Sequence, residues 1–258
     1  MKIYIFVDME GISGVSGSAM VSTAIGGAEY QRGRKCLTAE VNNCVKACFD
    51  AGADEVVVRD GHGGGNNIIW EDIKYDVDLV QGYTLKTRFA GIEGADGAIF
   101  LGYHAMAGTP NAVLEHTYSS KDIQNMWLNG KKVGEFEIDA AIAGEMGIPV
   151  IMTSGCDKLC AEAKECCPEV VTCQVKKSYS CNGVRMLSPI AAEKLVYEKT
   201  VEAVKGLKEG KFKPYTVSTP VTVRREFVER MDPGYNLVEP RTVEYVSDSV
   251  EKAFFGLV

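Results

Sequence analysis

Acidic and imidazole side chains follow three short apolar runs of the sequence. Asp8 and Glu10 come directly after the first run, His62 follows "VVVRDG", and His104 follows "AIFLGY". Carboxylates and imidazoles are ligands suited to Zn²⁺ or Mn²⁺, and a carboxylate can bridge two such ions roughly 3.5 to 4 Å apart. If the fold brings these residues together, their types indicate metal-assisted hydrolysis.

A site with two metal ions needs at least one further acid. The stretch "VGEFEIDAA" offers Glu135, Glu137 and Asp139 at the expected start of a helix, where an acid is favoured by the helix dipole and can point away from the core. The residues alone leave the choice among the three open. Asp60 is a candidate for a carboxylate that orients the imidazole of His62, with capping or a surface ion pair as the alternative.

The stretch "VDMEGISGVSG" at residues 7–17 could also be a glycine loop that binds a phosphate. Its glycines at 11, 14 and 17 do not have the GxGxxG spacing, and it lacks the lysine of a P-loop. Two carboxylates in the same loop would repel an anion. We therefore interpret the glycines as positions that let the chain turn away from two coordinating acids.

The cysteines offer a different metal site. A zinc or iron–sulfur cluster is the alternative for five of the nine, namely Cys156, Cys160, Cys166, Cys167 and Cys173. No CxxC pair occurs, and the count is odd with no framework spacing, which favours reduced thiols in a cytosol. We therefore expect a cytoplasmic protein whose metal ligands are oxygen and nitrogen atoms.

The elements that must position the candidate ligands are predicted from periodicity. Four apolar runs indicate buried parallel strands, at residues 3–7, 56–58, 98–101 and 150–152. Helical spacing and end signals predict helices at residues 29–52 and 134–145 and from a Ser188 N-cap, and Asn129-Gly130 predicts a hairpin. In an open α/β sheet, sites form at the carboxyl ends of the strands, where the candidate ligands fall.

The character of the chain changes after about residue 175. Pro214, Pro220, Pro233 and Pro240 punctuate short β-branched segments, which predicts antiparallel or edge strands closed by a helix near residues 248–255. We therefore expect an α/β fold with a mostly parallel sheet flanked by helices. Residues 1–185 would form the metal-binding catalytic domain, and residues 186–258 a smaller α+β unit packed on it.

Composition and charge limit the class of protein. With 258 residues and 46% hydrophobic content, the chain can bury a large core. Its formal net charge of -7 disfavours nucleic-acid and anionic-membrane partners, because both need a positively charged surface. The sequence has no apolar run of roughly 18 residues, and its start does not resemble a signal peptide. A small molecule or a peptide is the expected partner.

Four motifs together resemble the D-aminopeptidase family of zinc metallopeptidases over nearly the whole chain. They are "VDMEG", "RDGHG" around His62, "FLGYHAMAGTP" around His104, and "NGKKVGE" before the helix. The resemblance implies two zinc ions per subunit, both bridged by Asp8. Glu10 and His62 would complete one zinc site. His104 and Glu135 would complete the other.

The same resemblance implies an aminopeptidase that hydrolyses short peptides or amides with a free N-terminus and with D-amino acids. It places a further active-site residue in "NAVLEHTY", where His116 is the first candidate and Glu115 the second. His116 would stabilise the oxyanion or protonate the leaving amine. The resemblance also implies a ring-type homo-oligomer, a decamer of two stacked pentamers with active sites facing an inner chamber.

Other functions fit the same residue types. A different metal-dependent hydrolase, such as a phosphoesterase, could use these ligands, although the sequence has no obvious basic clamp for a phosphate. A metal-binding or sugar-binding module without turnover is an alternative from another class. In a plain α/β domain, the same acids would be solvated surface charges and would hold no metal.

Overall fold

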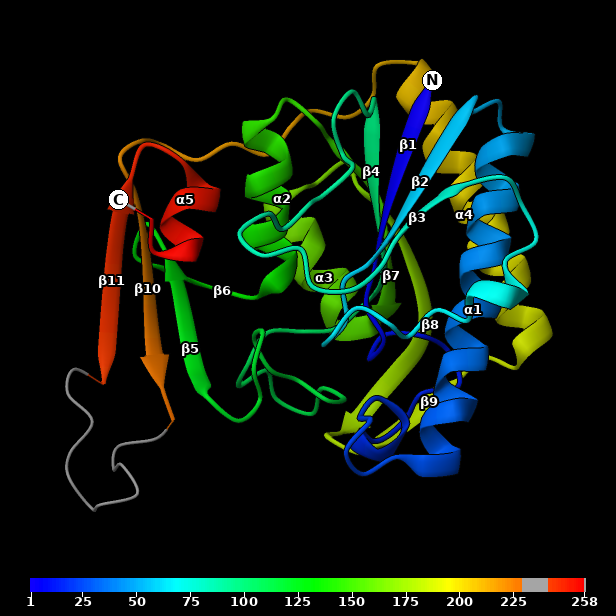
Figure 1. The fold of residues 1–258 in the computed structure, drawn as a ribbon, viewed down its shortest axis with the longest axis horizontal. Coiled ribbons are helices and arrows are strands. Elements are labelled where there is room, and N and C mark those ends of the chain that lie inside the picture. Colours follow the sequence, from blue (N-terminus) through cyan, green and yellow to red (C-terminus); the bar gives the residue numbers. More distant parts are fainter. Residues whose placement is uncertain (229–240, 258) are drawn as a thin grey trace.

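The computed structural model describes residues 1–228 and 241–257, which form two β-sheets and their covering helices (Figure 1). Sheet A contains β1 Lys2–Val7, β2 Glu55–Asp60, β3 Asp78–Val80, β4 Gly97–Tyr103, β7 Val150–Cys156, β8 Val171–Ser180 and β9 Gly183–Met186. Sheet B contains β5 Ile123–Leu128, β6 Lys131–Val133, β10 Val221–Phe227 and β11 Thr242–Ser247. The helices are α1 Gly27–Asp50, α2 Glu135–Glu145, α3 Asp157–Cys166, α4 Pro189–Lys208 and α5 Val250–Phe255, with short 3-10 helices η1 Ser18–Met20 and η2 Trp70–Asp72. The predicted breaks at Pro233 and Pro240 lie outside the described residues.

Sheet A places the ends of three strands side by side. Its strand order is β3-β2-β1-β4-β7-β8-β9, and its neighbouring strands are parallel except for β8 and β9. β1 lies between β2 and β4, with Val7 opposite Asp60 on one side and Leu101 on the other. Residues that follow these three strands therefore meet at one edge of the sheet.

Helices cover both faces of sheet A, with α1 and α4 on one face and α2 and α3 on the other (Figure 1). The residues of β1 alternate between the two layers. Ile3, Ile5 and Val7 pack in the core beneath α1 and α4, whereas Tyr4 and Phe6 pack in the core on the α2 side. A strand buried on both faces has a continuous apolar sequence, which is why this run was predictable.

The start of α4 and the turn between β5 and β6 lie where local sequence signals predict them. α4 begins at Pro189, and the Ser188 side chain accepts a hydrogen bond from the backbone N–H of Ala191. Asn129 and Gly130 have φ angles of 47° and 81°, the positive values of a two-residue hairpin turn between β5 and β6. Both predictions are confirmed.

The predicted fold class is confirmed, because the larger sheet is mostly parallel and flanked by helices. The four predicted apolar runs form β1, β2, β4 and β7, and the predicted helices correspond to α1, α2, α4 and α5. The sequence analysis did not identify β3, β8, β9 or α3. Within the described residues, no helix combines the length and apolar composition needed to cross a bilayer.

Elements on both sides of residue 185 share the same layers. α4 packs on α1 and against sheet A, and β10 pairs with β5 in sheet B. Sheet B therefore contains strands from before and after residue 185. The division into residues 1–185 and 186–258 stays a prediction.

Candidate metal centre

The carboxyl ends of β1, β2 and β4 bring four candidate ligands together. His62 Nδ1 lies 3.0 Å from Asp8 Oδ1 and 3.1 Å from Glu10 Oε2. His104 Nε2 lies 3.4 Å from Asp8 Oδ2. The two oxygens of Asp8 thus face two different histidines, and the Asp8, Glu10 and His104 side chains are all buried.

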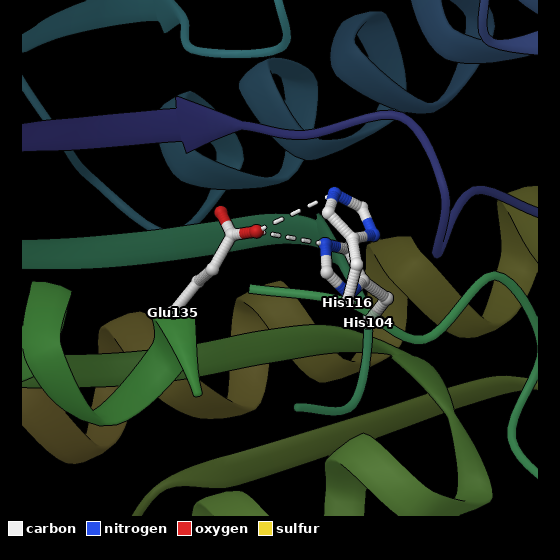
Figure 2. Close-up of side chains that lie close together, drawn as sticks. All are labelled: His104, His116 and Glu135. Atoms are coloured by element: carbon white, nitrogen blue, oxygen red, sulfur yellow. Dashed lines mark ion pairs between the residues drawn. The ribbon is translucent and has the colours of Figure 1, made fainter. Parts of the chain in front are cut away.

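Glu135, the first residue of α2, directs its carboxylate toward His104 and His116. Its Oε1 lies 3.2 Å from His104 Nε2 and 3.6 Å from His116 Nε2, and Figure 2 shows both imidazoles turned toward this oxygen. The rings of His104 and His116 stack with centroids 4.0 Å apart. The Tyr118 N–H donates to Glu135 Oε1 at 2.7 Å, so the loop that carries the two histidines also holds the carboxylate.

Each histidine has one ring nitrogen against a backbone carbonyl oxygen. The pairs are His62 Nε2 with Val21, His104 Nδ1 with Ala105 and His116 Nδ1 with Leu114, at 2.7, 3.0 and 2.9 Å. A carbonyl oxygen only accepts, so these nitrogens carry hydrogen, and the other nitrogen of a neutral ring presents a lone pair. These lone pairs face carboxylate oxygens, which also only accept. A proton or a metal ion must lie between them.

The cluster fits a divalent metal ion. Three buried atoms, Asp8 Oδ2, Glu10 Oε2 and His104 Nε2, have no hydrogen-bond partner among the described residues, and such atoms are costly unless something binds them. In a tetrahedral zinc site, bonds of roughly 2.0–2.1 Å put two ligand atoms about 3.3 Å apart. The nitrogen–oxygen distances here run from 3.0 to 3.6 Å, so the donor types and their spacing both match.

The electrostatics of the cluster favour positive charge at its centre. Burial disfavours the imidazolium of His62, but the charge of Glu10 and the hydrogen bond to Asp8 raise the pKa of His62 well above its ordinary value. Burial also acts to lower the pKa of His104, but the nearby charge of Glu135 outweighs burial and raises that pKa well above its ordinary value. For Glu135, burial is outweighed by the charge of His104, and the pKa is lowered.

Asp60 supports the loop that carries His62. Its fully buried carboxylate accepts hydrogen bonds from the backbone N–H groups of Asn67 and Ile68 and from the Asn67 side chain. Asn67 Nδ2 also donates to the carbonyl oxygen of His62 at 2.7 Å. Asp60 therefore orders the loop backbone, whereas both ring nitrogens of His62 have other partners.

The two candidates in the 111–118 stretch lie in different surroundings. His116 reaches Glu135, as described above. Glu115, which is half-buried, instead accepts a hydrogen bond from the Gly108 N–H at 2.5 Å. Glu115 thus braces the loop that carries the two stacked histidines, and the structure brings only His116 to the carboxylates.

One of the three acids at the start of α2 faces the histidines. Glu137 instead pairs with Lys131 Nζ at 2.8 Å and accepts a hydrogen bond from the Tyr215 hydroxyl at 2.7 Å. Asp139 follows Glu135 by one helical turn and is held by an arginine and two tyrosines. The geometry therefore selects Glu135 among the acids that the sequence left open.

Arg88 is a residue of this region that the sequence analysis missed. It donates from Nε and Nη2 to the two oxygens of Asp139, at 3.0 and 2.8 Å, and its Nη2 lies 3.7 Å from Glu135 Oε2. The hydroxyls of Tyr103 and Tyr118 donate to Asp139 at 2.7 and 3.0 Å. Arg88 lies between β3 and β4 in a stretch without a motif, so no local signal could identify it.

Close backbone contacts fix the loop that follows β1. The Gly11 N–H donates to the Gly102 carbonyl oxygen at 2.7 Å, and a Cβ at Gly11 would lie 2.0 Å from the Tyr103 carbonyl oxygen. Gly11 is therefore needed for the close approach of the two backbones.

The side chain of Lys176, which the sequence did not identify, also holds this loop. It is buried and donates from Nζ to the Glu10 carbonyl oxygen at 2.8 Å.

The cysteines take no part in the cluster. All nine are free thiols. Within the part of the chain that the structure describes, the groups of side chains able to hold a metal ion contain histidine, aspartate and glutamate and no cysteine. Cys44 and Cys48 lie on the buried face of α1 and pack in the core as small apolar side chains.

Histidines and carboxylates gathered at the carboxyl ends of parallel strands define the class of protein as a metal-dependent hydrolase with an α/β fold. The sequence matches peptidase family M55, described as D-aminopeptidase, over residues 1–257, and the chain belongs to this family. It is 39% identical over 220 residues to the D-aminopeptidase of Bacillus subtilis (strain 168), an alignment that covers 84% of this chain and 77% of that relative.

The fold is similar to a solved structure described as the Zn-dependent D-aminopeptidase DppA from Bacillus subtilis, a self-compartmentalizing protease. The TM-score is 0.89 at 33% sequence identity, and the match covers 99% of this chain and 95% of that chain. The family resemblance found in the sequence motifs is thus confirmed, and the chain is a metallopeptidase. Family membership favours this function over the phosphoesterase and the non-catalytic module.

Proposed function

We propose that Asp8, Glu10, His62, His104 and Glu135 bind two zinc ions in each subunit. The observation that carries this proposal is the position of Asp8, whose Oδ1 lies 3.0 Å from His62 and whose Oδ2 lies 3.4 Å from His104. A carboxylate that bridges two ions needs its oxygens to face two separate ligand groups. The zinc dependence of the related DppA supports the choice of metal.

The remaining ligands divide into two halves around Asp8. Glu10 and His62 are 3.1 Å apart, and Glu135 and His104 are 3.2 Å apart, so each half combines one carboxylate with one imidazole. When bound, the two ions supply Lewis acidity for the attack of water on a peptide carbonyl group. Arg88 and the Tyr118 N–H orient Glu135 for its half of the site.

His116 is proposed to act on the substrate. Its side chain is 17% exposed, against 1% for His104, so it forms the outer member of the stacked pair. Its Nδ1–H is held by the Leu114 carbonyl oxygen, which leaves Nε2 to give or take a proton. We assign to His116 the stabilisation of the oxyanion or the protonation of the leaving amine, with Glu115 bracing its loop.

The proposed substrate is a short peptide or amide that has a free N-terminus and contains a D-amino acid. The D-aminopeptidase family and the activity named for the Bacillus subtilis relative support this substrate class.

The proposed assembly is a ring-type homo-oligomer, a decamer of two pentamers, in the cytoplasm. The description of DppA as self-compartmentalizing supports self-association. Light scattering should give ten times the chain mass of 28.0 kDa, and the mass of a monomer would contradict the assembly.

Hydrolysis assays with zinc-loaded protein test the proposed function. We expect release of D-alanine from D-alanyl-D-alanine, slower hydrolysis of the L,L dipeptide, and no hydrolysis of p-nitrophenyl phosphate. Cleavage of the phosphate ester alone would support a phosphoesterase. Full zinc content without cleavage of any dipeptide would support a non-catalytic module.

Two substitutions on the same helix provide a matched control for these assays. Glu135→Gln should lose zinc and activity, because it removes a charged ligand. Glu137→Gln should retain both, since Glu137 pairs with Lys131 and Tyr215 outside the cluster. The ligand assignment fails if the two variants hold the same amount of zinc.

A further inference from the structure

A glutamate on α3 contacts both segments that carry the ligands of one proposed zinc site. Glu162 Oε2 accepts a hydrogen bond from the Met106 N–H at 2.9 Å, and Met106 follows His104 by two residues. Glu162 Oε1 lies against Gly134, because a Cβ built on that glycine would be 2.4 Å from this oxygen. Gly134 directly precedes Glu135. Glu162 therefore lies between the chain neighbours of two proposed ligands.

The two segments also pack directly on each other beside Glu162. The same Cβ at Gly134 would be 2.7 Å from Met106 Cβ and 3.1 Å from Met106 Cα, so only the hydrogen atom of a glycine fits there. The ligand atoms that follow from this contact, His104 Nε2 and Glu135 Oε1, are 3.2 Å apart. A shift of either segment would therefore change the spacing of the two ligands.

The side chain of Glu162 is held from the side of sheet A. α3 packs against β7 and β8, which fixes the backbone of this glutamate. Its Oε1 is buried and has no hydrogen-bond partner among the described residues. Gly134 is the N-cap of α2, and the dipole of a helix favours negative charge beside its N-terminus. The carboxylate thus holds one segment by a hydrogen bond and adjoins the positive end of the helix that begins with Glu135.

We propose that Glu162 is a positioning residue for the zinc ion held by His104 and Glu135. This role, which rests on the two-zinc site proposed above, requires no contact between Glu162 and the ion. Glu162 acts through Met106 and Gly134, and it keeps the imidazole and the carboxylate at the spacing that a shared ion needs. Contacts that orient metal ligands in this way contribute to metal affinity.

The other proposed zinc site has supporting contacts of its own. Lys176 Nζ on β8 donates to the Glu10 carbonyl oxygen at 2.8 Å, and Asn67 Nδ2 donates to the His62 carbonyl oxygen at 2.7 Å. Neither contact involves α3. Loss of the Glu162 side chain should therefore weaken the binding of one zinc ion and spare the other.

Zinc titration of the metal-free, full-length protein against a chelating indicator tests this role. Glu162→Leu removes the acceptor for the Met106 N–H, so one of the two zinc ions should bind about 10- to 100-fold more weakly, the usual effect of losing a contact that supports a ligand. The other ion should keep its wild-type affinity. Glu162→Gln retains an acceptor oxygen and should weaken the same ion by a smaller factor. Glu165→Gln, an exposed acid on the same helix, should have no effect.

Hydrogen exchange provides a readout that does not depend on zinc. In the metal-free Glu162→Leu variant, peptides that contain Met106 should exchange faster than in the wild type, because the Met106 N–H has lost its acceptor. Peptides from β1 should exchange at the wild-type rate. Glu162→Gln should be close to the wild type in this measurement, and it carries the zinc test if Glu162→Leu fails to fold.

The outcomes separate this role from the metal site on which it rests. A wild-type protein that binds fewer than two zinc ions would refute the two-zinc site itself. If the wild type binds two ions, the role of Glu162 is overturned when Glu162→Leu weakens both ions equally, or when neither variant weakens either ion.

Discussion

The imidazole rings of His104 and His116 stack with centroids 4.0 Å apart and planes 12° apart. Both rings present Nε2 to the same oxygen of Glu135, at 3.2 and 3.6 Å. They differ in access, because the inner ring of His104 is enclosed and the outer ring of His116 is partly exposed. The difference in access supports the proposed roles, in which His104 binds metal and His116 transfers a proton.

Alanine substitutions of the two stacked histidines should therefore have different effects. We expect His116→Ala to retain both zinc ions and to lose about 10²- to 10⁴-fold in kcat, the range for removal of a general acid or base. His104→Ala should lose zinc, since it removes the enclosed imidazole that we propose as a ligand and leaves only the outer ring of His116 near Glu135. Metal analysis beside steady-state kinetics measures both. Loss of zinc in His116→Ala would place that histidine among the ligands.

Stabilisation by zinc should increase with pH. In the metal-free protein, the raised pKa values of His62 and His104 contribute stability that is fully present below the ordinary value of 6.5 and is lost as pH rises through the raised values. Zinc binds the neutral rings, so its binding displaces protons and becomes stronger at higher pH.

The Tm difference between zinc-loaded and EDTA-treated protein should therefore widen from about pH 6 to about pH 8. Differential scanning fluorimetry of the two forms, in buffers matched for ionic strength, measures this difference. A gap that stays constant or narrows over the same range would argue against histidine ligation.

Arg88→Met should destabilise the fold strongly. The substitution leaves the fully buried carboxylate of Asp139 without its charged partner, which costs about 3–5 kcal/mol of unfolding free energy. The matched control is Lys194→Met, which removes a partner of Glu198 in an exposed pair 3.8 Å long and should cost about 1 kcal/mol or less. Urea denaturation measures the unfolding free energy of both variants. Equal losses would contradict the larger contribution expected of the buried Arg88–Asp139 pair.

Gly11→Ala should displace the loop that carries Glu10. The added Cβ would lie 2.0 Å from a backbone oxygen of β4, which cannot move aside as a flexible side chain could. We expect a loss of about 1–3 kcal/mol in stability and a weaker affinity for zinc. Gly17→Ala is the control in the same loop, because that position has an extended backbone and no atom within 4 Å of a new Cβ. Similar zinc affinity in both variants would refute the packing argument.

The edge of sheet A that holds the site could be predicted because its strands are buried on both faces. Such strands have continuous apolar sequences, as in β1 and β4, whose residues are almost entirely inaccessible. Once the strands are parallel, their carboxyl ends share an edge, and the positions of Asp8, His62 and His104 follow from the topology.

The choice among the acids of α2 could not be predicted from the sequence. Glu135 and Asp139 are four residues apart and lie on one face of the helix, whereas Glu137 lies on another. Which face meets the histidines depends on how α2 packs against β4 and β7. Asp139 forms an ion pair with Arg88, which lies 51 residues earlier in the chain. A partner that distant leaves no local pattern in the sequence.

Sheet B was only partly predictable for the same reason. The turn at Asn129 identified the hairpin of β5 and β6, since a two-residue turn has a local signature. The pairing of β5 with β10 joins residues about a hundred positions apart, such as Asn125 and Glu226. No short-range signal in the sequence specifies that partner.

X-ray diffraction from crystals of the zinc-loaded protein, measured on both sides of the zinc absorption edge, would locate the metal ions bound at Asp8. We expect two anomalous peaks roughly 3.5 to 4 Å apart, each within about 2.2 Å of a different oxygen of Asp8. A single peak, or two peaks that do not share Asp8, would contradict the proposed two-zinc site.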